Sequence, residues 1–210
     1  MDWMPWNQPG YAAPSFTSPP PREPAPLESA PTVLDGGARP AVAPVPPERT
    51  SFASTYAAGT IVIATSERRL YLVQSPTEAL VYPISVGREG FTWTGTEQIS
   101  RIADWPDWHP PAEMRERDPR LPEKMTGGVR NPLGAKALYL GNTLYRIHGT
   151  DNERTIGRAT SSGCFRMTNG QVTDLAGRVG TGTQVVVLDQ LPRNLAELAP
   201  SRSTMTPQKQ

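Results

Sequence analysis

The chain has 210 residues, with 21 basic and 20 acidic side chains and a formal net charge of +1. A charge this small creates no field that would attract nucleic acid or an anionic membrane, so no polyanionic partner is expected. The single cysteine excludes an internal disulfide, and no Cys/His cluster has the spacing of a zinc site. Neither a disulfide nor a metal is therefore expected to stabilise the fold.

The first ten residues, MDWMPWNQPG, contain neither the basic segment nor the apolar segment of a signal peptide. No run of about 18 apolar residues is present, so no membrane-spanning helix is predicted. Because secreted proteins are often written without their signal sequence, the compartment has to be inferred from function.

Proline dominates the first fifty residues, which hold 13 of the 24 prolines and few large aliphatic residues. Such a composition cannot bury enough apolar surface to offset the entropy lost on ordering. Residues 1–58 are therefore predicted to form a disordered Pro-rich tether with partial polyproline II character. A recognition motif for a proline-binding domain is the alternative.

Short β-rich runs begin at Thr60. In these runs Val, Ile, Leu and Tyr alternate with polar residues, and Gly, Ser-Pro or Gly-Asn separate one run from the next. This pattern is typical of hairpins and meanders, and it predicts a mostly β, largely antiparallel fold. The predicted strands cover residues 60–65, 69–73, 79–86, 137–140, 143–148 and 183–188.

Residues 87–133 form an irregular stretch in which prolines interrupt every candidate element. An insertion this long inside a compact domain is typical of a functional lid or a binding loop, and a structural flap over the core is the alternative. Trp93, Trp105 and Trp108 could line a groove or could anchor the flap to the sheet, so no ligand contact is assigned to them.

One helix is predicted from about Asn169 to Val179, with Asn169 as its cap and Gly180 as the residue that ends it. From Val172 onward, apolar residues recur at i, i+3, i+4 and i+7, so this stripe should lie on the sheet. The polar end of the chain, residues 191–210, is predicted to be a second disordered tail.

The sole cysteine, Cys164, lies in the polar run SSGCFRM at residues 161–167. Most unpaired cysteines are buried small hydrophobes, and this structural role stays open. However, a glycine beside a nucleophile lets backbone amides approach a reacting carbonyl, and the helix predicted to begin near Asn169 would favour a thiolate through its positive end. Cys164 is therefore a candidate nucleophile at a turn.

His148 ends the run TLYRIH, 16 residues before the cysteine, and Gly149 begins a turn. An imidazole at a strand end can reach a nucleophile at a neighbouring turn, so His148 is the candidate base, with a surface histidine as the alternative. His109 is interpreted as a solvated flap residue. Arg166 lies on the same side of an extended segment as Cys164 and could hold a substrate carboxylate or form a surface salt bridge.

The runs IHGT at residues 147–150 and SSGCFRM at residues 161–167 together resemble the catalytic signature of the L,D-transpeptidases, the YkuD-type domain family. The signature is a His-Gly pair, a spacer, and a Ser-x-Gly-Cys-hydrophobic-Arg run. The resemblance extends to VGREGFTWTGTE, NPLGAKALYL and VGTGTQVVVL. It implies a YkuD-like β-sandwich or barrel with one or two short helices and a long irregular flap, and a catalytic domain over residues 59–190.

The resemblance also implies a reaction. Cys164 would attack the carbonyl of the third residue of a peptidoglycan tetrapeptide stem and release the terminal D-alanine. A side-chain amine of a second stem would then take the acyl group and form a 3→3 cross-link. His148 would act as general base and later as acid, oriented by the carbonyl of Gly149. No metal or organic cofactor is implied.

The family pattern implies roles for the neighbouring residues as well. The amides of Gly163 and Cys164 would form the oxyanion hole. Arg166 would steady the active-site turn or meet a substrate carboxylate. Ser162 stands where many members carry a second histidine, so a donor role for its side chain stays open.

Because peptidoglycan lies outside the inner membrane, the resemblance implies a periplasmic or envelope protein that acts on stem peptides and is acylated by carbapenem-type β-lactams. We expect the protein to be a monomer, although no sequence feature determines its oligomeric state. The Pro-rich segment would be a spacer between an anchor and the wall. Three alternatives stay open: an enzyme that transfers stems to the amine of an envelope protein, a sortase, and a non-catalytic module that binds wall peptides. No sequence feature fixes the acceptor.

Overall fold

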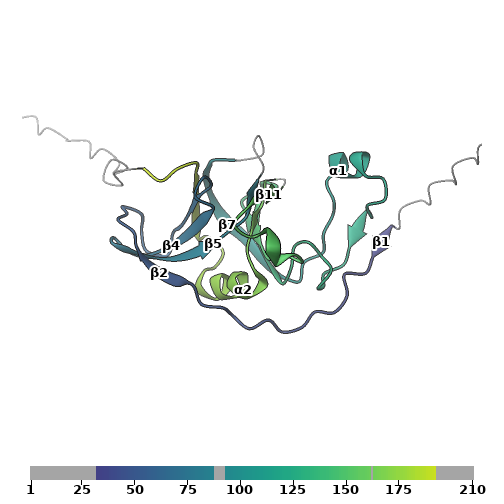
Figure 1. Cartoon of the computed structure of the whole chain (residues 1–210), viewed down its shortest axis with the longest axis horizontal. Helices are drawn as coiled ribbons and strands as arrows, with labels where there is room; N and C mark the ends of the chain where they lie inside the picture. Colours follow the sequence, from purple (N-terminus) through teal and green to yellow (C-terminus); the bar gives the residue numbers. More distant parts are fainter. Residues whose placement is uncertain (1–31, 88–92, 162, 193–210) are drawn as a thin grey trace, which may run out of the picture.

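The computed structural model describes residues 32–87, 93–161 and 163–192 and is mostly β, which confirms the predicted fold class (Figure 1). The elements in chain order are β1 (Val33–Leu34), β2 (Glu48–Ser51), β3 (Ile61–Ala64), β4 (Arg69–Ser75), β5 (Glu78–Pro83), β6 (Val86–Gly87), β7 (Gly95–Asp104), α1 (Ala112–Arg117), β8 (Lys124–Met125), β9 (Lys136–Leu140), β10 (Arg146–His148), a 3-10 turn (Glu153–Thr155), β11 (Ala159–Ser161), β12 (Phe165–Arg166), α2 (Asn169–Arg178) and β13 (Gln184–Leu188).

Nine strands form one sheet in the order β12-β10-β9-β7-β13-β3-β4-β5-β2. The pairs β10–β12 and β13–β3 are parallel, and the other neighbours in this sheet are antiparallel. Two short parallel pairs, β1–β8 and β6–β11, lie outside it. The sequence predicted this largely antiparallel pairing from the short alternating runs.

Both faces of the central strands are buried, because alternate residues of the apolar runs enter two separate cores. Ile61 and Ile63 belong to the larger core, whereas Val62 and Ala64 belong to the smaller one. α2 packs Val172 and its neighbouring apolar residues into the larger core, as its sequence periodicity predicted.

The N-terminal prediction needs a correction. Residues 1–31 lie outside the described residues, but residues 32–58 follow a defined path, whereas the sequence predicted a tether up to residue 58. β2 pairs with β5 at the edge of the sheet, and Phe52 is buried with its ring stacked 4.7 Å from that of Tyr71. A Pro-rich composition disfavours a core of its own, yet an extended segment can donate its backbone to an existing sheet edge.

Residues 35–47, called the strap here, connect β1 to β2 and run along one side of the molecule, as Figure 1 shows. The strap contacts the segment that follows β8: the Gly36 amide donates to Thr126 Oγ1 at 2.9 Å, and Arg39 Nε donates to Gly127 O at 2.9 Å. Farther along, the Val45 amide donates to Gly170 O in α2 at 2.9 Å. The strap therefore links the irregular insertion to the helix beside the sheet.

The irregular stretch at residues 87–133 contains a strand that the sequence did not predict. β7 lies in the sheet between β9 and β13, although among its residues only Ile99 is fully buried. A register irregularity between Ile99 and Arg101 also interrupts the two-residue alternation. Residues 105–133 are irregular apart from the short α1 and β8, and they are called the flap below.

Candidate active site

His148 and Cys164 lie on adjacent segments at one end of the sheet. β10 and β12 pair in parallel, with Ile147 opposite Phe165 and His148 opposite Arg166. Ile147 and Phe165 point into the larger core, so the residues that alternate with them share the opposite face. This register places Cys164, which directly precedes β12, beside Arg146. The strand pairing thus gathers Arg146, His148, Cys164 and Arg166 on one surface.

The His148 side chain is buried, and its Nδ1 lies 2.7 Å from Gly149 O. A carbonyl oxygen only accepts hydrogen bonds, so in the neutral ring the proton resides on Nδ1 and Nε2 is the nitrogen that can take up a proton. Burial lowers the pKa of His148 to about 3, with the nearby charge of Arg166 as the next cause. Hydrogen bonding to the backbones of Gly149 and Leu133 opposes this shift. The imidazole is neutral at neutral pH.

Cys164 is half-buried, and its Sγ lies 3.8 Å from Leu144 O. Burial raises the pKa of the thiol, whereas Arg146, through its charge and its hydrogen bonds, and Arg166 oppose the increase. The sequence predicted that the start of α2 would favour the thiolate. The net shift of this pKa is nevertheless upward, because desolvation by burial is its largest cause. At rest the site holds a thiol and a neutral imidazole.

Gly163, which precedes the nucleophile candidate, is buried and has a φ angle of 113°. A side chain at this backbone angle would be strained, so glycine is required here for the turn itself. The proposed neighbour Ser162 lies outside the described residues. The roles of the Gly163 and Cys164 amides and of Ser162 stay predictions.

Arg166 is bound to the sheet through its backbone, since its amide and carbonyl exchange hydrogen bonds of 2.9 Å with Ser85. Its side chain is half-buried, and its Nε is buried with no hydrogen-bond partner among the described residues. Arg166 forms no ion pair with any residue that the structure describes. The surface salt bridge that the sequence left open as an alternative role for Arg166 is therefore not found among these residues. The charge of Arg166 instead acts on His148.

Asn169 has a role that the sequence did not indicate. The sequence predicted that it caps α2, but the cap is Thr168, whose side chain accepts from the Gln171 amide at 3.3 Å. Asn169 Oδ1 instead accepts from the amides of Ala135 at 2.9 Å and Thr150 at 3.2 Å, and its Nδ2 donates to Thr150 O at 2.9 Å. Because capping and cross-linking both call for a short polar side chain, no sequence signal distinguishes the two roles.

This cross-link depends on the glycine after His148. A Cβ atom placed on Gly149 would lie 2.2 Å from Asn169 Oδ1, which is a steric clash. The glycine therefore lets the Asn169 amide approach the turn that follows His148, while its own carbonyl contacts the imidazole. Asn169 thus fixes the backbone that orients the ring.

A hollow of about 330 Å³ lies between the sheet and the flap, and one of its lining residues is Arg146, which lies beside Cys164. Tyr139 and Arg146 come from the sheet, Leu133 ends the flap, and His109 is exposed on the flap side. The complete lining consists of Arg101, Pro106, Asp107, Trp108, His109, Leu133, Tyr139 and Arg146.

The three tryptophans have different surroundings. Trp93 stacks on Tyr145 with 5.2 Å between the ring centroids and packs against the larger core. Trp105 donates through Nε1 to Pro40 O in the strap at 3.2 Å. Only Trp108 of the three lines the hollow beside the catalytic candidates. Anchoring therefore accounts for two of them, and the groove interpretation holds for the third.

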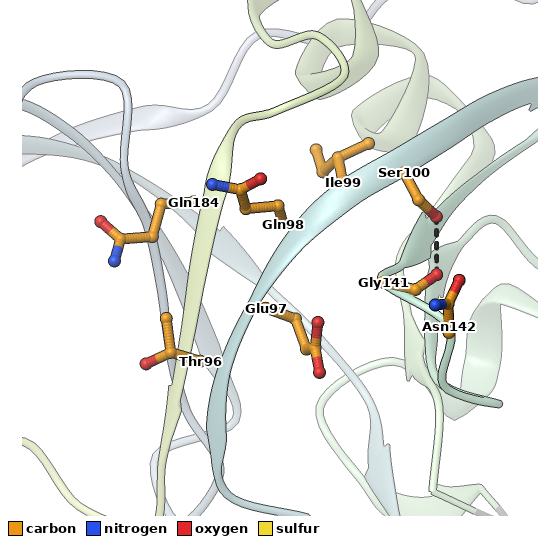
Figure 2. A pocket seen from close by; sticks show the side chains of 8 residues that line it. All are labelled: Thr96, Glu97, Gln98, Ile99, Ser100, Gly141, Asn142 and Gln184. Atoms are coloured by element: carbon orange, nitrogen blue, oxygen red, sulfur yellow. Dashed lines mark hydrogen bonds between the residues drawn. The ribbon is translucent and has the colours of Figure 1, made fainter.

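A second hollow, of about 430 Å³, lies along β7 and is lined mostly by polar residues (Figure 2). In it Ser100 Oγ donates to Gly141 O at 2.8 Å, which bridges β7 to the turn after β9. This hollow shares no residue with the first one, and neither hollow is lined by His148 or Cys164. We assign no function to it.

Among residues 32–87, 93–161 and 163–192, no three His, Cys, Asp or Glu side chains come together as a metal site. The same part of the chain has no helix with the length and apolar character needed to cross a membrane.

The fold and the His–Cys surface define a catalytic domain of known type. The chain belongs to the L,D-transpeptidase catalytic domain family, whose model, named YkuD, matches residues 58–187. The predicted resemblance is confirmed by this match.

Two relatives in Escherichia coli are similar to this chain. It is 37% identical to "Probable L,D-transpeptidase YbiS" and 34% identical to "Probable L,D-transpeptidase ErfK/SrfK", each over 139 residues that cover 62% of this chain and 44% of the relative. The chain therefore matches less than half the length of these relatives. L,D-transpeptidase 3 from Mycobacterium tuberculosis has the same fold, with a TM-score of 0.50 and 15% identity over 62% of this chain and 61% of that one.

Proposed function

We propose that this domain is a peptidoglycan L,D-transpeptidase that uses Cys164 as its nucleophile. The observation that carries the proposal is the neutral His148, held by the Gly149 carbonyl on the strand next to the cysteine, in a chain of this family. A base whose other ring nitrogen is fixed by a carbonyl is the arrangement that activates a thiol.

In the first half of the reaction, Nε2 of His148 takes the thiol proton as Sγ attacks the carbonyl of the third stem residue. General base catalysis fits a pair that is neutral at rest. The amides of Gly163 and Cys164 would donate to the oxyanion of the tetrahedral intermediate. When the intermediate collapses, the imidazolium protonates the departing amine of D-alanine, and a thioester remains.

Burial, followed by the nearby charge of Arg166, lowers the pKa of His148 and so gives the imidazolium a strong tendency to release its proton. Proton delivery to the leaving amine is thereby favoured, whereas proton uptake from the thiol becomes harder. The site would compensate in the first step through attack on a carbonyl whose developing charge is stabilised by backbone amides.

In the second half of the reaction, a side-chain amine of another stem attacks the thioester. His148 takes a proton from that amine, and Cys164 leaves and is protonated. The product is an amide bond between two third residues, a 3→3 cross-link. Because this substrate is assembled outside the inner membrane, we propose a periplasmic or envelope location.

The experiment mixes the purified chain, and separately its Cys164→Ala variant, with peptidoglycan tetrapeptide fragments, and measures released D-alanine and the mass of the peptide products. Release that needs the cysteine, together with a cross-linked dimer, is the expected result. Release without a dimer would indicate water or a protein amine as acceptor. If both proteins bind the fragments and neither releases D-alanine, the chain is a binding module and the proposal is wrong.

A further inference from the structure

A row of side chains crosses four segments of the sheet and ends at Cys164. Arg101 on β7 is opposite Tyr139 on β9, and Tyr139 is opposite Arg146 on β10. Directly paired residues of antiparallel strands point to the same face with Cβ atoms about 5 Å apart. Since Arg146 in turn lies beside Cys164, the row brings two arginines to the face that carries the nucleophile candidate.

The two guanidinium groups lie against the same aromatic ring. Cζ of Arg101 is 3.9 Å from the centroid of the Tyr139 ring, and Cζ of Arg146 is 5.2 Å from it. An arginine held by an aromatic face keeps the N–H groups at its edge available for a planar anion. The row is therefore preorganised to donate hydrogen bonds.

Among the residues that the structure describes, no acidic side chain forms an ion pair with either arginine. Arg146 Nε is buried without a hydrogen-bond partner in the same part of the chain. Asp107 is the carboxylate that lines the same hollow, but Lys124 Nζ lies 2.7 Å from it and the Gly127 amide donates to it at 2.9 Å. Two like charges side by side with an unmet donor favour an anion from outside the chain.

The hollow has room for such a group. Its volume of about 330 Å³ corresponds to roughly ten water molecules, which is enough for one amino-acid residue. Leu133 forms part of its wall, and the Leu133 backbone is also close enough to His148 to act on the pKa of the imidazole. Because Arg146 lines the hollow and also lies beside Cys164, a ligand in the hollow lies next to the nucleophile candidate.

We propose that Arg101 and Arg146 form a carboxylate-binding subsite for the stem peptide. The subsite would hold a carboxylate that lies within one residue of the scissile carbonyl, and this inference rests on the proposed function. Two carboxylates meet that condition: the terminal carboxylate of the departing D-alanine, and a free carboxylate on the diamino acid at the third position. Both would be bound through charge-assisted hydrogen bonds at about 2.8 Å.

The test measures binding, so that it does not depend on turnover. In the Cys164→Ala background, calorimetry compares the tetrapeptide fragment with two analogues, one amidated at the terminal D-alanine and one amidated at the free carboxylate of the third residue. We expect one analogue to bind about 10- to 100-fold more weakly, as loss of a hydrogen bond to a charged group implies. The analogue that loses affinity identifies the carboxylate.

Arg101→Gln and Arg146→Gln should weaken binding of the parent fragment by a similar factor. Neither substitution should further weaken binding of the amidated analogue that has already lost affinity, because that analogue lacks the carboxylate that the arginines bind. Arg101→Lys should restore part of the affinity. The matched control is Arg49→Gln, since Arg49 is an exposed residue of β2 that is paired with Glu78 and should leave the affinity unchanged.

Equal affinity for the parent and both analogues would overturn the subsite, and so would arginine variants that weaken all three ligands alike. D-alanine release by the unmodified chain, measured in parallel, reports on the proposed function itself. Loss of carboxylate discrimination with intact release would refute only the subsite. Discrimination without release would refute only the transpeptidase reaction.

Discussion

Acid should destabilise this protein through His148, and the substitution His148→Gln should remove that part of the acid destabilisation. The burial that lowers the pKa of this imidazole to about 3 in the folded chain is lost on unfolding, where the pKa returns to about 6.5. Above pH 6.5 both states hold a neutral ring, so His148 has no effect on the pH dependence. Below that pH the unfolded state binds a proton that the folded state rejects, and stability falls as the pH falls toward 3.

The size of the effect follows from the two pKa values. A pH of 4.5 lies about two units below the pKa of the imidazole in the unfolded chain, so the ring is protonated there. In the folded chain the pKa is about 3, so the ring is still neutral. Each unit corresponds to about 1.4 kcal/mol, so the free energy of unfolding should decrease by roughly 3 kcal/mol between pH 7.5 and pH 4.5 on account of His148 alone. This is a large part of the roughly 5 to 15 kcal/mol that stabilises a typical domain.

The assay is urea denaturation at the two pH values, for the unmodified chain and for His148→Gln. Carboxylates such as Asp174, whose pKa is lowered mainly by the side-chain hydrogen bond from Arg178, also lose stabilising contacts in acid, but they do so equally in both proteins. The difference between the two pH dependences therefore isolates the histidine. If both proteins lose the same stability between pH 7.5 and pH 4.5, His148 is not held neutral by burial and the reasoning is refuted.

Three further predictions follow from particular contacts. Asn169→Ala should lower the free energy of unfolding by about 2 to 4 kcal/mol, because three hydrogen bonds are lost, and should reduce kcat more than KM; the exposed Asn142→Ala should do neither, and equal kinetic effects would refute the positioning role. Gly163→Ala and Gly157→Ala should each cost about 1 to 3 kcal/mol, since both positions have positive φ, but only Gly163→Ala should abolish acylation in stopped-flow assays. Removal of residues 1–47 should speed proteolysis of the flap, because the strap binds it; an unchanged cleavage pattern would contradict this.

The catalytic candidates could be predicted from the sequence because they lie in short runs whose residue types already limit the chemistry. A histidine at the end of an apolar alternating run and a cysteine beside glycine are local features, and the pairing of β10 with β12 brings them together. The ionisation state could not be predicted in this way. It depends on burial by distant segments, which raises the pKa of Cys164 despite the helix that follows.

The arginine row and the role of Asn169, which the sequence did not reveal, depend on how distant elements pair and pack. β7 lacks an apolar alternation, because most of its side chains are exposed or half-buried and a register irregularity interrupts it at Ser100. Without β7, the row from Arg101 through Tyr139 to Arg146 cannot be seen, since its members are separated by many residues along the chain. Likewise, the contacts of Asn169 with Thr150 exist only once α2 is packed beside β10.

Whether Cys164 carries the acyl group can be decided from the intact mass of the protein after a rapid acid quench. The chain is mixed with a tetrapeptide fragment, or with a carbapenem-type β-lactam, and the adduct is located by peptide mapping. We expect a mass increase equal to the mass of the fragment minus that of D-alanine, or to the mass of the whole β-lactam, on the peptide that contains Cys164, and no adduct in Cys164→Ala. An adduct that forms equally in the variant, or an unmodified mass with both reagents, would contradict this expectation.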